Sequence, residues 1–343
     1  MLTRTDVRLA DWTTLRVGGP VRTFVEAGTR QYLYEAVAAA DAAGEDVLVL
    51  GGGSNLVVGD EGFAGRAIRV ANRGITVHEE VPSSEVEVVV EAGENWDALV
   101  ARAVVSGWVG VEALAGIPGT VGAVPIQNVG AYGQEVAETI SLVHVFDRVD
   151  RRPRTMSAAD CGFGYRTSVF KQNPGRYVVG TVSFRFQPGT GGEPIQYAEL
   201  ARELRVPVGG SASLSDVRQA VLRLRRSKGM VLDGADHDTW SVGSFFTNPF
   251  LAPDQLPDGA PSYLQPDGTC KTSAAWLIDR AGFPKGYGNE RVRLSTKHTL
   301  ALTNRGSASA EDVLGLAREI RAGVEARFGI VLQPEPVRIN CDL

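Results

Sequence analysis

Long apolar runs are missing from this chain. No uncharged apolar stretch approaches the roughly 18 residues that a bilayer-spanning helix needs. The first fifteen residues carry Arg4, Asp6, Arg8 and Asp11 where a secretory signal would have an apolar core. The sequence therefore predicts a protein that stays in the cytoplasm and has no membrane partner.

An excess of one charge is also missing. The formal net charge is only −5, and charged residues make up 22% of the chain. A broad basic surface that would hold a nucleic-acid backbone is not expected from this balance, so nucleic acid is excluded as a partner. An anionic ligand would have to be bound locally, by backbone amides and a few cations.

Cysteine and histidine are few and widely spaced. The three cysteines contain no C-x-x-C pair and are expected to be reduced: Cys161, Cys270 and Cys341. The four histidines are equally scattered: His78, His144, His237 and His298. A metal centre would need single ligands from distant segments, so no metal is predicted.

The 343 residues are enough for two or three hydrophobic cores. Apolar periodicity and capping residues predict helices that begin after Thr29, at Trp96, after Ser213 and after Ser309. Strands are predicted over residues 47–50, 56–58, 67–70, 85–91, 140–146, 177–186 and 332–338. Residues 151–154 are predicted to form a polar linker, and a domain boundary is predicted near residue 228.

Glycine is abundant, with 40 residues, and it gathers in two loops. The first, Gly51-Gly52-Gly53-Ser54-Asn55, follows the strand over 47–50. It does not match the dinucleotide fingerprint G-x-G-x-x-G, because Leu56 stands at the third glycine and a strand pattern follows. A plain hairpin is one interpretation. Close approach to a ligand is favoured, because three glycines cost more backbone entropy than a hairpin needs.

The second loop, residues 116–133, holds five glycines and two prolines among uncharged side chains. It is either a buried crossover or an anion-binding concavity made of backbone N–H groups. Two such loops together would clasp a pyrophosphate without a lysine. Taken alone, either loop is a weak signal.

Six ordered motifs, spread over nearly the whole chain, resemble one known family. They are Gly51-Gly52-Gly53-Ser54-Asn55, Ile117-Pro118-Gly119, Pro125-Ile126-Gln127-Asn128-Val129-Gly130-Ala131-Tyr132-Gly133, Phe163-Gly164-Tyr165-Arg166, Gly243-Ser244-Phe245-Phe246-Thr247-Asn248-Pro249 and Pro334-Glu335. The chain resembles the UDP-N-acetylenolpyruvoylglucosamine reductases, the MurB enzymes. Tyr197, within Ile195-Gln196-Tyr197-Ala198-Glu199-Leu200, matches the longer type I branch, and Pro336 departs from the family pattern.

The resemblance implies an α+β protein with a two-subdomain FAD-binding fold of the vanillyl-alcohol-oxidase type, followed by an α/β substrate-binding domain. The implied domains are residues 1–73 and 74–228 for the two FAD subdomains and 229–330 for the substrate domain, with residues 331–343 returning to the first subdomain. It also implies an NADPH-dependent oxidoreductase of peptidoglycan synthesis that acts as a monomer on a sugar nucleotide.

The implied cofactors are non-covalent FAD and NADPH. The residues that match FAD-binding positions of the family all lie in the two glycine loops: Gly51, Gly52, Gly53, Ser54, Asn55, Gly119, Thr120, Gly122, Gln127, Asn128, Gly130 and Ala131. The positions that match substrate contacts are Tyr197, Lys228 and Asn248. His298 also matches a recurrent family position, but its chemistry suggests no role.

The implied catalytic residues are Arg166, Ser244 and Glu335, and each suits the chemistry. Hydride addition to an enolpyruvyl methylene leaves negative charge that spreads into the carboxylate. Arg166 offers a planar fork to that carboxylate, Ser244 a proton for the carbanion, and Glu335 a protonated carboxyl group. From the residues alone, a surface ion pair, a capping serine and a solvated acid are the corresponding alternatives.

Two other functions compete with this reading. A flavin oxidase of the same fold would use oxygen, but covalent attachment of flavin, frequent in such enzymes, has no obvious residue here, because no histidine or cysteine precedes His78. A non-catalytic FAD or sugar-nucleotide binding protein would keep the glycine loops but would have no need of Arg166, Ser244 and Glu335.

Overall fold

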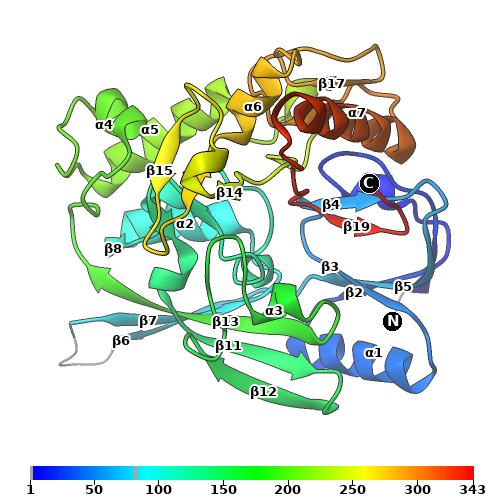
Figure 1. The fold of residues 1–343 in the computed structure, drawn as a ribbon. Helices are drawn as coiled ribbons and strands as arrows, with labels where there is room; N and C mark the ends of the chain where they lie inside the picture. Colours follow the sequence, from blue (N-terminus) through cyan, green and yellow to red (C-terminus); the bar gives the residue numbers. More distant parts are fainter. Residues whose placement is uncertain (1–2, 80–83) are drawn as a thin grey trace. The chain divides into compact units, whose positions relative to one another are not determined.

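The computed structural model describes residues 3–79 and 84–343 (Figure 1). Its chain divides into two compact units. Unit 1 comprises Met1–Asp6, Val21–Gly52 and Ala64–Arg226, and unit 2 comprises Val7–Pro20, Gly53–Phe63 and Ser227–Leu343. Each unit is therefore assembled from segments that are far apart in the sequence. The three-part division 1–73, 74–228 and 229–330 remains a prediction.

The first sheet of unit 1 has the strand order β1-β2-β5-β3. These strands are Thr3–Arg4, Val21–Ala27, Phe63–Val70 and Val47–Leu50, and β3 runs parallel to β5. Helix α1 (Arg30–Ala42) begins after Thr29, whose hydroxyl accepts the N–H of Tyr32 at 3.1 Å. The helix buries an apolar face made of Leu33, Ala36, Val37 and Ala40. The predicted helix, its cap and strand β3 are confirmed.

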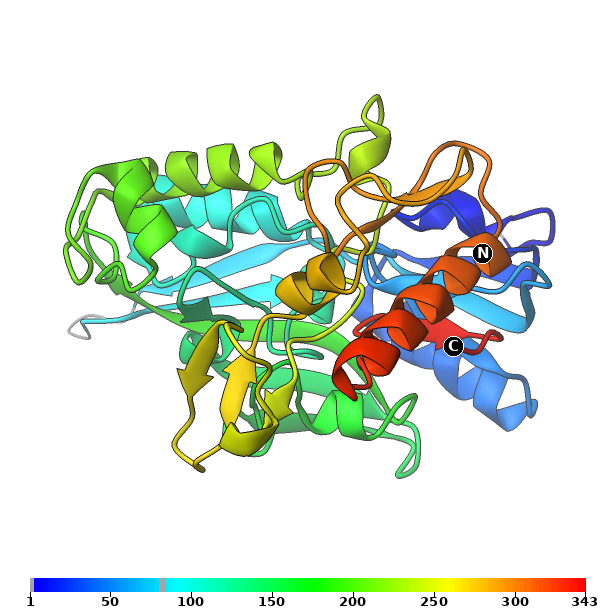
Figure 2. The same cartoon turned by 45° about the horizontal axis from the view of Figure 1, so that its top comes forward.

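The second sheet of unit 1 is antiparallel, with the order β12-β11-β13-β7-β6. Its strands are Arg152–Ser157, Ile140–Asp147, Tyr177–Pro188, Val86–Glu91 and Ile75–Glu79, and β8 (Trp108–Val109) pairs with the end of β13. Figures 1 and 2 show α2 (Trp96–Ser106) and α5 (Leu214–Ser227) over one face of this sheet. Trp96 of α2 packs on Phe184 of β13, with ring centroids 6.1 Å apart.

Both covering helices have the predicted ends. Gly107 closes α2 in the left-handed conformation, at φ 72°. Ser213 accepts the N–H of Asp216 and caps α5. The smaller elements of unit 1 are α3 (Val169–Gln172), α4 (Ala198–Leu204), β9 (Gly130–Ala131), β10 (Gln134–Glu135) and the 3₁₀ turns η2 (Glu112–Leu114), η3 (Val121–Ala123) and η4 (Val136–Glu138).

The predicted linker over residues 151–154 is wrong. Residues Arg152–Ser157 form β12, which pairs antiparallel with β11 in the register Asp147↔Arg152 to Leu142↔Ser157. The strand is the outermost of its sheet, and only Met156 is buried. An outer strand tolerates polar side chains and a proline, here Pro153, so its composition resembles that of a loop.

Unit 2 is built around the long helix α7 (Ala310–Phe328). Ser309 and Asp312 form the predicted capping box, and Gly329 ends the helix at φ 69°. Its apolar face packs in one hydrophobic cluster with Phe245, Phe246 and α6 (Ala274–Arg280). The other elements are η1 (Leu9–Trp12), β4 (Leu56–Val58), η5 (His237–Thr239), β14 (Phe250–Leu251), η6 (Pro253–Gln255), β15 (Ser262–Leu264), β16 (Cys270–Thr272), β17 (Val292–Leu294), β18 (Leu302–Asn304) and β19 (Val337–Ile339).

The last strand is shorter than predicted. The sequence pattern predicts a strand over 332–338, whereas β19 covers Val337–Ile339 and pairs parallel with β4. The preceding residues bond elsewhere: the N–H of Thr247 donates to Gln333 and the N–H of Glu335 donates to Phe245. The predicted strand over 332–338 therefore pairs with two different segments: Gln333 and Glu335 bond to residues 245–247, and β19 pairs with β4.

Within residues 3–79 and 84–343, no helix is long and apolar enough to cross a membrane. The three cysteines are free thiols, as predicted. Desolvation raises the pKa of the buried Cys161 thiol to about 12, so this group stays protonated at neutral pH.

Asp147, at the end of β11, provides a test of this fold. Its buried carboxylate pairs with Arg176 at 2.8 Å and accepts the amides of Val149 and Asp150. The hydrogen bond from Arg176 lowers the pKa of Asp147 most, the two amides add to this, and burial opposes it. We predict that Asp147→Asn lowers the free energy of unfolding at pH 6.

A carboxyl group whose folded pKa is lowered stabilises the fold above its unfolded pKa of about 3.9, and this contribution is lost as pH falls through the folded value. Urea unfolding from pH 6 to about pH 3 should therefore show the gap between wild type and Asp147→Asn closing on acidification. A gap independent of pH would contradict this role for the ionised carboxylate.

Candidate functional site

The two glycine loops meet in unit 1. A Cβ at Gly52 would lie 2.7 Å from the Gly119 Cα, and a Cβ at Gly51 would lie 2.7 Å from the Thr120 hydroxyl oxygen. Gly119 itself has φ 124°, a conformation that favours glycine. Only residues without a side chain allow the two backbones to approach this closely. The arrangement fits a cofactor that is bound by backbone groups of both loops.

The second loop is fixed against the start of α2. The N–H of Gly122 donates to Ala92 at 2.8 Å, and a Cβ at Gly122 would lie 2.6 Å from the Ala92 Cβ. The carbonyl of Gly119 accepts the N–H of Trp96, the first residue of α2. Gly119, Thr120 and Gly122 are therefore held by the sheet and helix of the same unit.

The end of the first loop belongs to unit 2. Gly53 has φ 62°, and a Cβ there would lie 1.9 Å from the Trp12 carbonyl oxygen. Its own carbonyl accepts the N–H of Thr14, and the carbonyl of Asn55 accepts the N–H of Val337 at the start of β19. Residues 53–55 are thus anchored on both sides by backbone bonds of unit 2.

Three residues of unit 1 other than glycine have left-handed backbones near the second loop: Asn128 (φ 46°), Tyr132 (φ 51°) and Arg166 (φ 53°). The Asn128 amide donates to Glu135 at 2.7 Å and to the Gly164 carbonyl at 3.2 Å, and its oxygen accepts the N–H of Ala137. Strained backbones of this kind cost about 1–3 kcal/mol each and gather at functional sites.

Arg166 is half-buried and is held by the second loop. Its Nη2 donates to the Gly130 carbonyl at 2.7 Å, and its guanidinium lies 5.7 Å from the Tyr165 ring. Because one donor is committed to a backbone carbonyl, the orientation of the guanidinium fork is defined. Gly130, a predicted cofactor residue, thus supports the predicted catalytic arginine, and Asn128 bonds to Gly164, two residues before it.

Tyr132 and Arg225, which interact electrostatically with each other, are not among the site residues that the sequence predicts. Burial raises the pKa of Tyr132 to about 12, against the charge of Arg225. Burial lowers the pKa of Arg225 to about 10, with Tyr132 and Asp97 opposing this shift and Arg166 adding to it. The Tyr132 ring meets Tyr197 edge to face, with centroids 6.0 Å apart. The sequence signal for Tyr132 is its position inside the second glycine loop. Arg225 has no such signal, because a positive charge near the end of a helix is common.

Tyr197 precedes α4 and is 53% exposed. Lys228 lies in unit 2, in the residues that follow α5. The Asn248 side-chain oxygen accepts the N–H of Ala274 at the first turn of α6, at 3.0 Å. This bond fixes the side chain through its oxygen, and a ligand would be met by the amide N–H groups.

Ser244 and Glu335 lie on paired segments of unit 2. The N–H of Glu335 donates to the Phe245 carbonyl at 2.9 Å, and the N–H of Thr247 donates to the Gln333 carbonyl at 3.0 Å. Phe245 is fully buried, so the pairing is anchored in the core. Pro336 does not disturb this arrangement, because both bonds use N–H groups of other residues.

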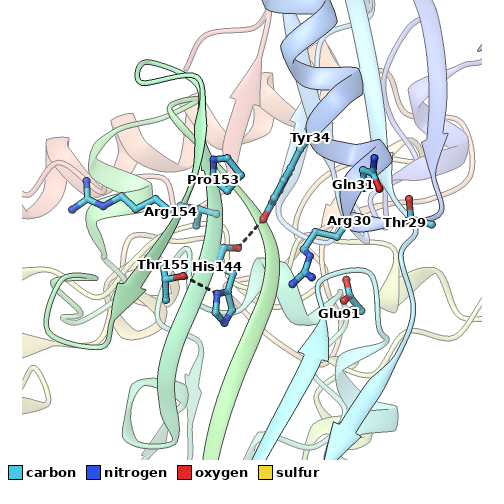
Figure 3. Close-up of a pocket in the computed structure, with 10 residues that line it drawn as sticks. Thr29, Arg30, Gln31, Tyr34, Glu91, His144, Pro153, Arg154 and Thr155 are labelled. Atoms are coloured by element: carbon cyan, nitrogen blue, oxygen red, sulfur yellow. Dashed lines mark hydrogen bonds between the residues drawn. The ribbon is translucent and has the colours of Figure 1, made fainter.

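A groove in unit 1 contains none of the predicted site residues. It has a volume of about 610 Å³ and lies between the first turn of α1 and strands β11 and β12 (Figure 3). Arg30 and Glu91 place opposite charges on its walls. Burial, followed by the charge of Arg30, lowers the pKa of His144. Tyr34 donates its hydroxyl to the His144 carbonyl.

The mixed α+β fold and the close approach of the two glycine loops fit a protein that binds FAD. An FAD-binding domain model matches residues 21–150, and the model of the UDP-N-acetylenolpyruvoylglucosamine reductase C-terminal domain matches residues 235–339. The chain belongs to the UDP-N-acetylenolpyruvoylglucosamine reductase family.

Relatives that carry this name are similar over almost the full length. The enzyme of Thermobifida fusca is 55% identical, with 98% of each chain covered. That of Cutibacterium acnes is 53% identical, with 98% of this chain and 90% of the relative covered. The crystal structure of the reductase MurB from Thermus caldophilus superposes with a TM-score of 0.68 at 27% identity, covering 98% of this chain and 100% of that chain.

These matches confirm the family resemblance and the fold class. They also confirm the predicted cofactors, FAD and NADPH. The roles of individual site residues remain predictions.

The contact between the glycine loops leads to a test with a matched control. We predict that Gly52→Ala weakens FAD binding tenfold or more, about 1.4 kcal/mol, because its Cβ would force Gly119 away. Gly28→Ala, in the same unit, should bind FAD like wild type, because a Cβ there meets no atom within 4 Å. The measurement is the amount of intact FAD released when each purified, yellow protein is denatured.

Equal flavin content in Gly52→Ala and wild type, confirmed by titration of apoprotein with FAD, would contradict this account of the loops. Flavin that stays with the denatured polypeptide would contradict non-covalent binding.

Proposed function

We propose that this protein reduces UDP-N-acetylglucosamine-enolpyruvate to UDP-N-acetylmuramate with NADPH, a step in peptidoglycan precursor synthesis. The proposal rests chiefly on the paired segments that carry a hydroxyl group, Ser244, and a carboxyl group, Glu335. Relatives named as UDP-N-acetylenolpyruvoylglucosamine reductases, 55% and 53% identical over 98% of this chain, support it. The cytoplasmic location and monomeric state remain predictions.

Bound FAD supplies the redox chemistry, by which a hydride passes from NADPH to the methylene carbon of the enolpyruvyl group. The electron pair of the carbon–carbon double bond then resides on the adjacent carbon and spreads into the carboxylate. Two negative charges thus share one small group, and this group needs fixed donors. The residues of this chain are proposed to stabilise this charge and to deliver a proton.

Arg166 is proposed to bind the carboxylate of the enolpyruvyl group. Its guanidinium is a planar fork of N–H donors, and the bond from Nη2 to the Gly130 carbonyl orients that fork. A preorganised fork of this kind contributes a few kcal/mol as negative charge accumulates. The left-handed backbone at Arg166 is consistent with a residue held in place for function.

Glu335 is proposed to act in its protonated form, as a hydrogen-bond donor to the same charge. An ionised carboxylate would repel the developing enediolate. The residue is half-buried, and its N–H bond to Phe245 fixes its backbone. The proposal requires that the site keep this carboxyl group protonated, as apolar surroundings do in other enzymes.

Ser244 is proposed to give its hydroxyl proton to the carbanionic carbon. A carbanion is basic enough to take a proton from an alcohol, so an ordinary general acid is not required. Ser244 follows Gly243, whose φ is 75°, and precedes the buried Phe245. The serine alkoxide is reprotonated from water after the product forms, which balances the reaction.

Tyr197, Lys228 and Asn248 are proposed to bind the nucleotide part of the substrate. Lys228 provides a cation for the diphosphate, and Tyr197 and Asn248 provide hydrogen-bond donors. Tyr197 is exposed and follows Gly189, Gly191 and Gly192, a segment suited to closure over a ligand.

The Tyr197 hydroxyl leads to a prediction. Tyr197→Phe should weaken UDP-sugar binding by about 0.5–1.5 kcal/mol, the value of one hydrogen bond, because the ring remains while its donor is removed. Reduction of the flavin by NADPH should change little. Isothermal titration with the UDP-sugar and rapid mixing with NADPH measure the two effects. Equal losses in both experiments would show that the residue is not specific for the sugar nucleotide.

Ser244 allows the two half-reactions to be separated. Reduction of flavin by NADPH needs no proton on a substrate carbon, so Ser244→Ala should reduce its flavin at nearly the wild-type rate. Reoxidation by the enolpyruvyl substrate should slow by about 10²–10⁴-fold, the usual contribution of a positioned acid. Ser244→Cys should retain more activity than the alanine variant, because a thiol also donates.

Rapid-mixing absorbance of the flavin follows both half-reactions in one preparation. The assignment of Ser244 fails if the alanine variant is reoxidised within a few-fold of wild type.

A further inference from the structure

A turn in unit 2, residues 295–300, lies against the segment that carries Ser244. The turn connects β17 with β18. Its last residue, Leu300, accepts the N–H of Phe245 at 2.8 Å. Phe245 in turn accepts the N–H of Glu335. One continuous line of backbone hydrogen bonds therefore runs from this turn past Ser244 to Glu335.

The imidazole of His298 makes a hydrogen bond within the turn. Its Nδ1 accepts the N–H of Leu300 at 3.1 Å. An accepting Nδ1 places the ring proton on Nε2. Leu300 is only 9% exposed, so its N–H would lose its partner in a largely buried position if the imidazole were removed. Such a loss costs more than an exposed hydrogen bond and favours rearrangement of the turn.

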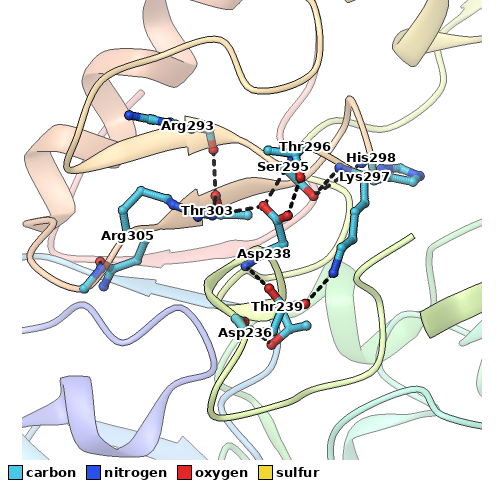
Figure 4. Close-up of polar contacts among 12 residues, drawn as sticks. Asp236, Asp238, Thr239, Arg293, Ser295, Thr296, Lys297, His298, Thr303 and Arg305 are labelled. Carbon is cyan, nitrogen blue, oxygen red and sulfur yellow. Dashed lines mark hydrogen bonds and ion pairs between the residues drawn. The ribbon is translucent and has the colours of Figure 1, made fainter. Parts of the chain in front are cut away.

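The other side of the turn is tied down by ionic groups (Figure 4). Asp238 is 5% exposed, accepts the N–H of Thr296 at 3.2 Å and pairs with Arg305 at 2.9 Å. Lys297 forms an ion pair with Asp236. Ser295, fully buried, accepts the N–H groups of Lys297 and His298. The turn is therefore fixed at its beginning. Backbone bonds also close it: the N–H of Ala301 donates to the His298 carbonyl at 3.2 Å, and the N–H of Ser295 donates to the Ala301 carbonyl at 2.8 Å. The imidazole of His298 adds the bond that satisfies the N–H of Leu300.

We propose that His298 is a positioning residue for Ser244: its Nδ1 holds Leu300, and the carbonyl of Leu300 holds the backbone at Phe245. The imidazole acts through this backbone and not on the substrate. This inference rests on the proposed role of Ser244. It gives a physical reason for a histidine at this position, where the sequence suggests none.

Three variants separate positioning from direct action. The Asn oxygen Oδ1 stands the same number of bonds from the backbone as His Nδ1, so His298→Asn retains an acceptor for Leu300. His298→Gln places its amide near the position of Nε2 instead. His298→Ala removes both. Flavin content and thermal unfolding of each purified holoenzyme check that it folds, and rapid mixing measures the two half-reactions.

We expect His298→Asn to be reoxidised by the enolpyruvyl substrate within about threefold of wild type. His298→Gln and His298→Ala should be slowed by about 10–100-fold, because a displacement of about 1 Å at a reacting group costs up to 10² in rate. Reduction by NADPH should change by less than about threefold in all three. If the alanine variant does not fold, the comparison of Asn with Gln still decides.

A second experiment uses Ser244→Ala as background. If His298 acts through Ser244, His298→Ala should cause little further loss in this background. An equal further loss would overturn the proposal, as would a glutamine variant faster than the asparagine variant. Failure of the proposed function is distinguishable, because the wild-type enzyme itself would then not be reoxidised by the enolpyruvyl substrate.

Discussion

The approach of two glycine backbones, at Gly52 and Gly119, is the constraint on which the arrangement of unit 1 depends. It joins the end of β3 to the start of α2, and Gly122 continues the contact along β7 through Ala92. From there the loop reaches Asn128, which bonds to Gly164, and Gly130, which accepts a bond from Arg166. In the proposed function, a chain with little excess charge would bind its cofactor through backbone groups of these loops, and cations would meet the substrate.

Hydrogen bonds with backbone groups also fix the residues proposed for catalysis, or their neighbours. Arg166 donates to a carbonyl, Glu335 is fixed by its own N–H, and the neighbour of Ser244 is fixed by Leu300. Such supports do not titrate near neutral pH. In the proposed mechanism they would hold the Arg166 fork and the backbone at Ser244 and Glu335 without adding charge near an anionic intermediate, as electrostatic preorganisation requires.

Local signals predicted the helices well. Thr29, Ser213 and Ser309 are caps, and Gly107 and Gly329 are closing residues, as their spacing from the apolar periods indicates. Strand β12 is not predicted, because an outer strand with one buried side chain shows almost no alternation of polar and apolar residues. The final strand is shorter than predicted because the change of hydrogen-bond partner between Glu335 and Val337 depends on contacts with distant segments. Tyr132 and Arg225 escaped for the same reason: their burial is a tertiary property.

The most direct test of the proposed function is anaerobic mixing of the NADPH-reduced wild-type protein with UDP-N-acetylglucosamine-enolpyruvate. Absorbance of oxidised flavin should return within the turnover time, and one UDP-N-acetylmuramate should form for each flavin reoxidised. Flavin that stays reduced in the presence of this substrate, yet is reoxidised by oxygen at a rate sufficient for turnover, would contradict the account and indicate an oxidase.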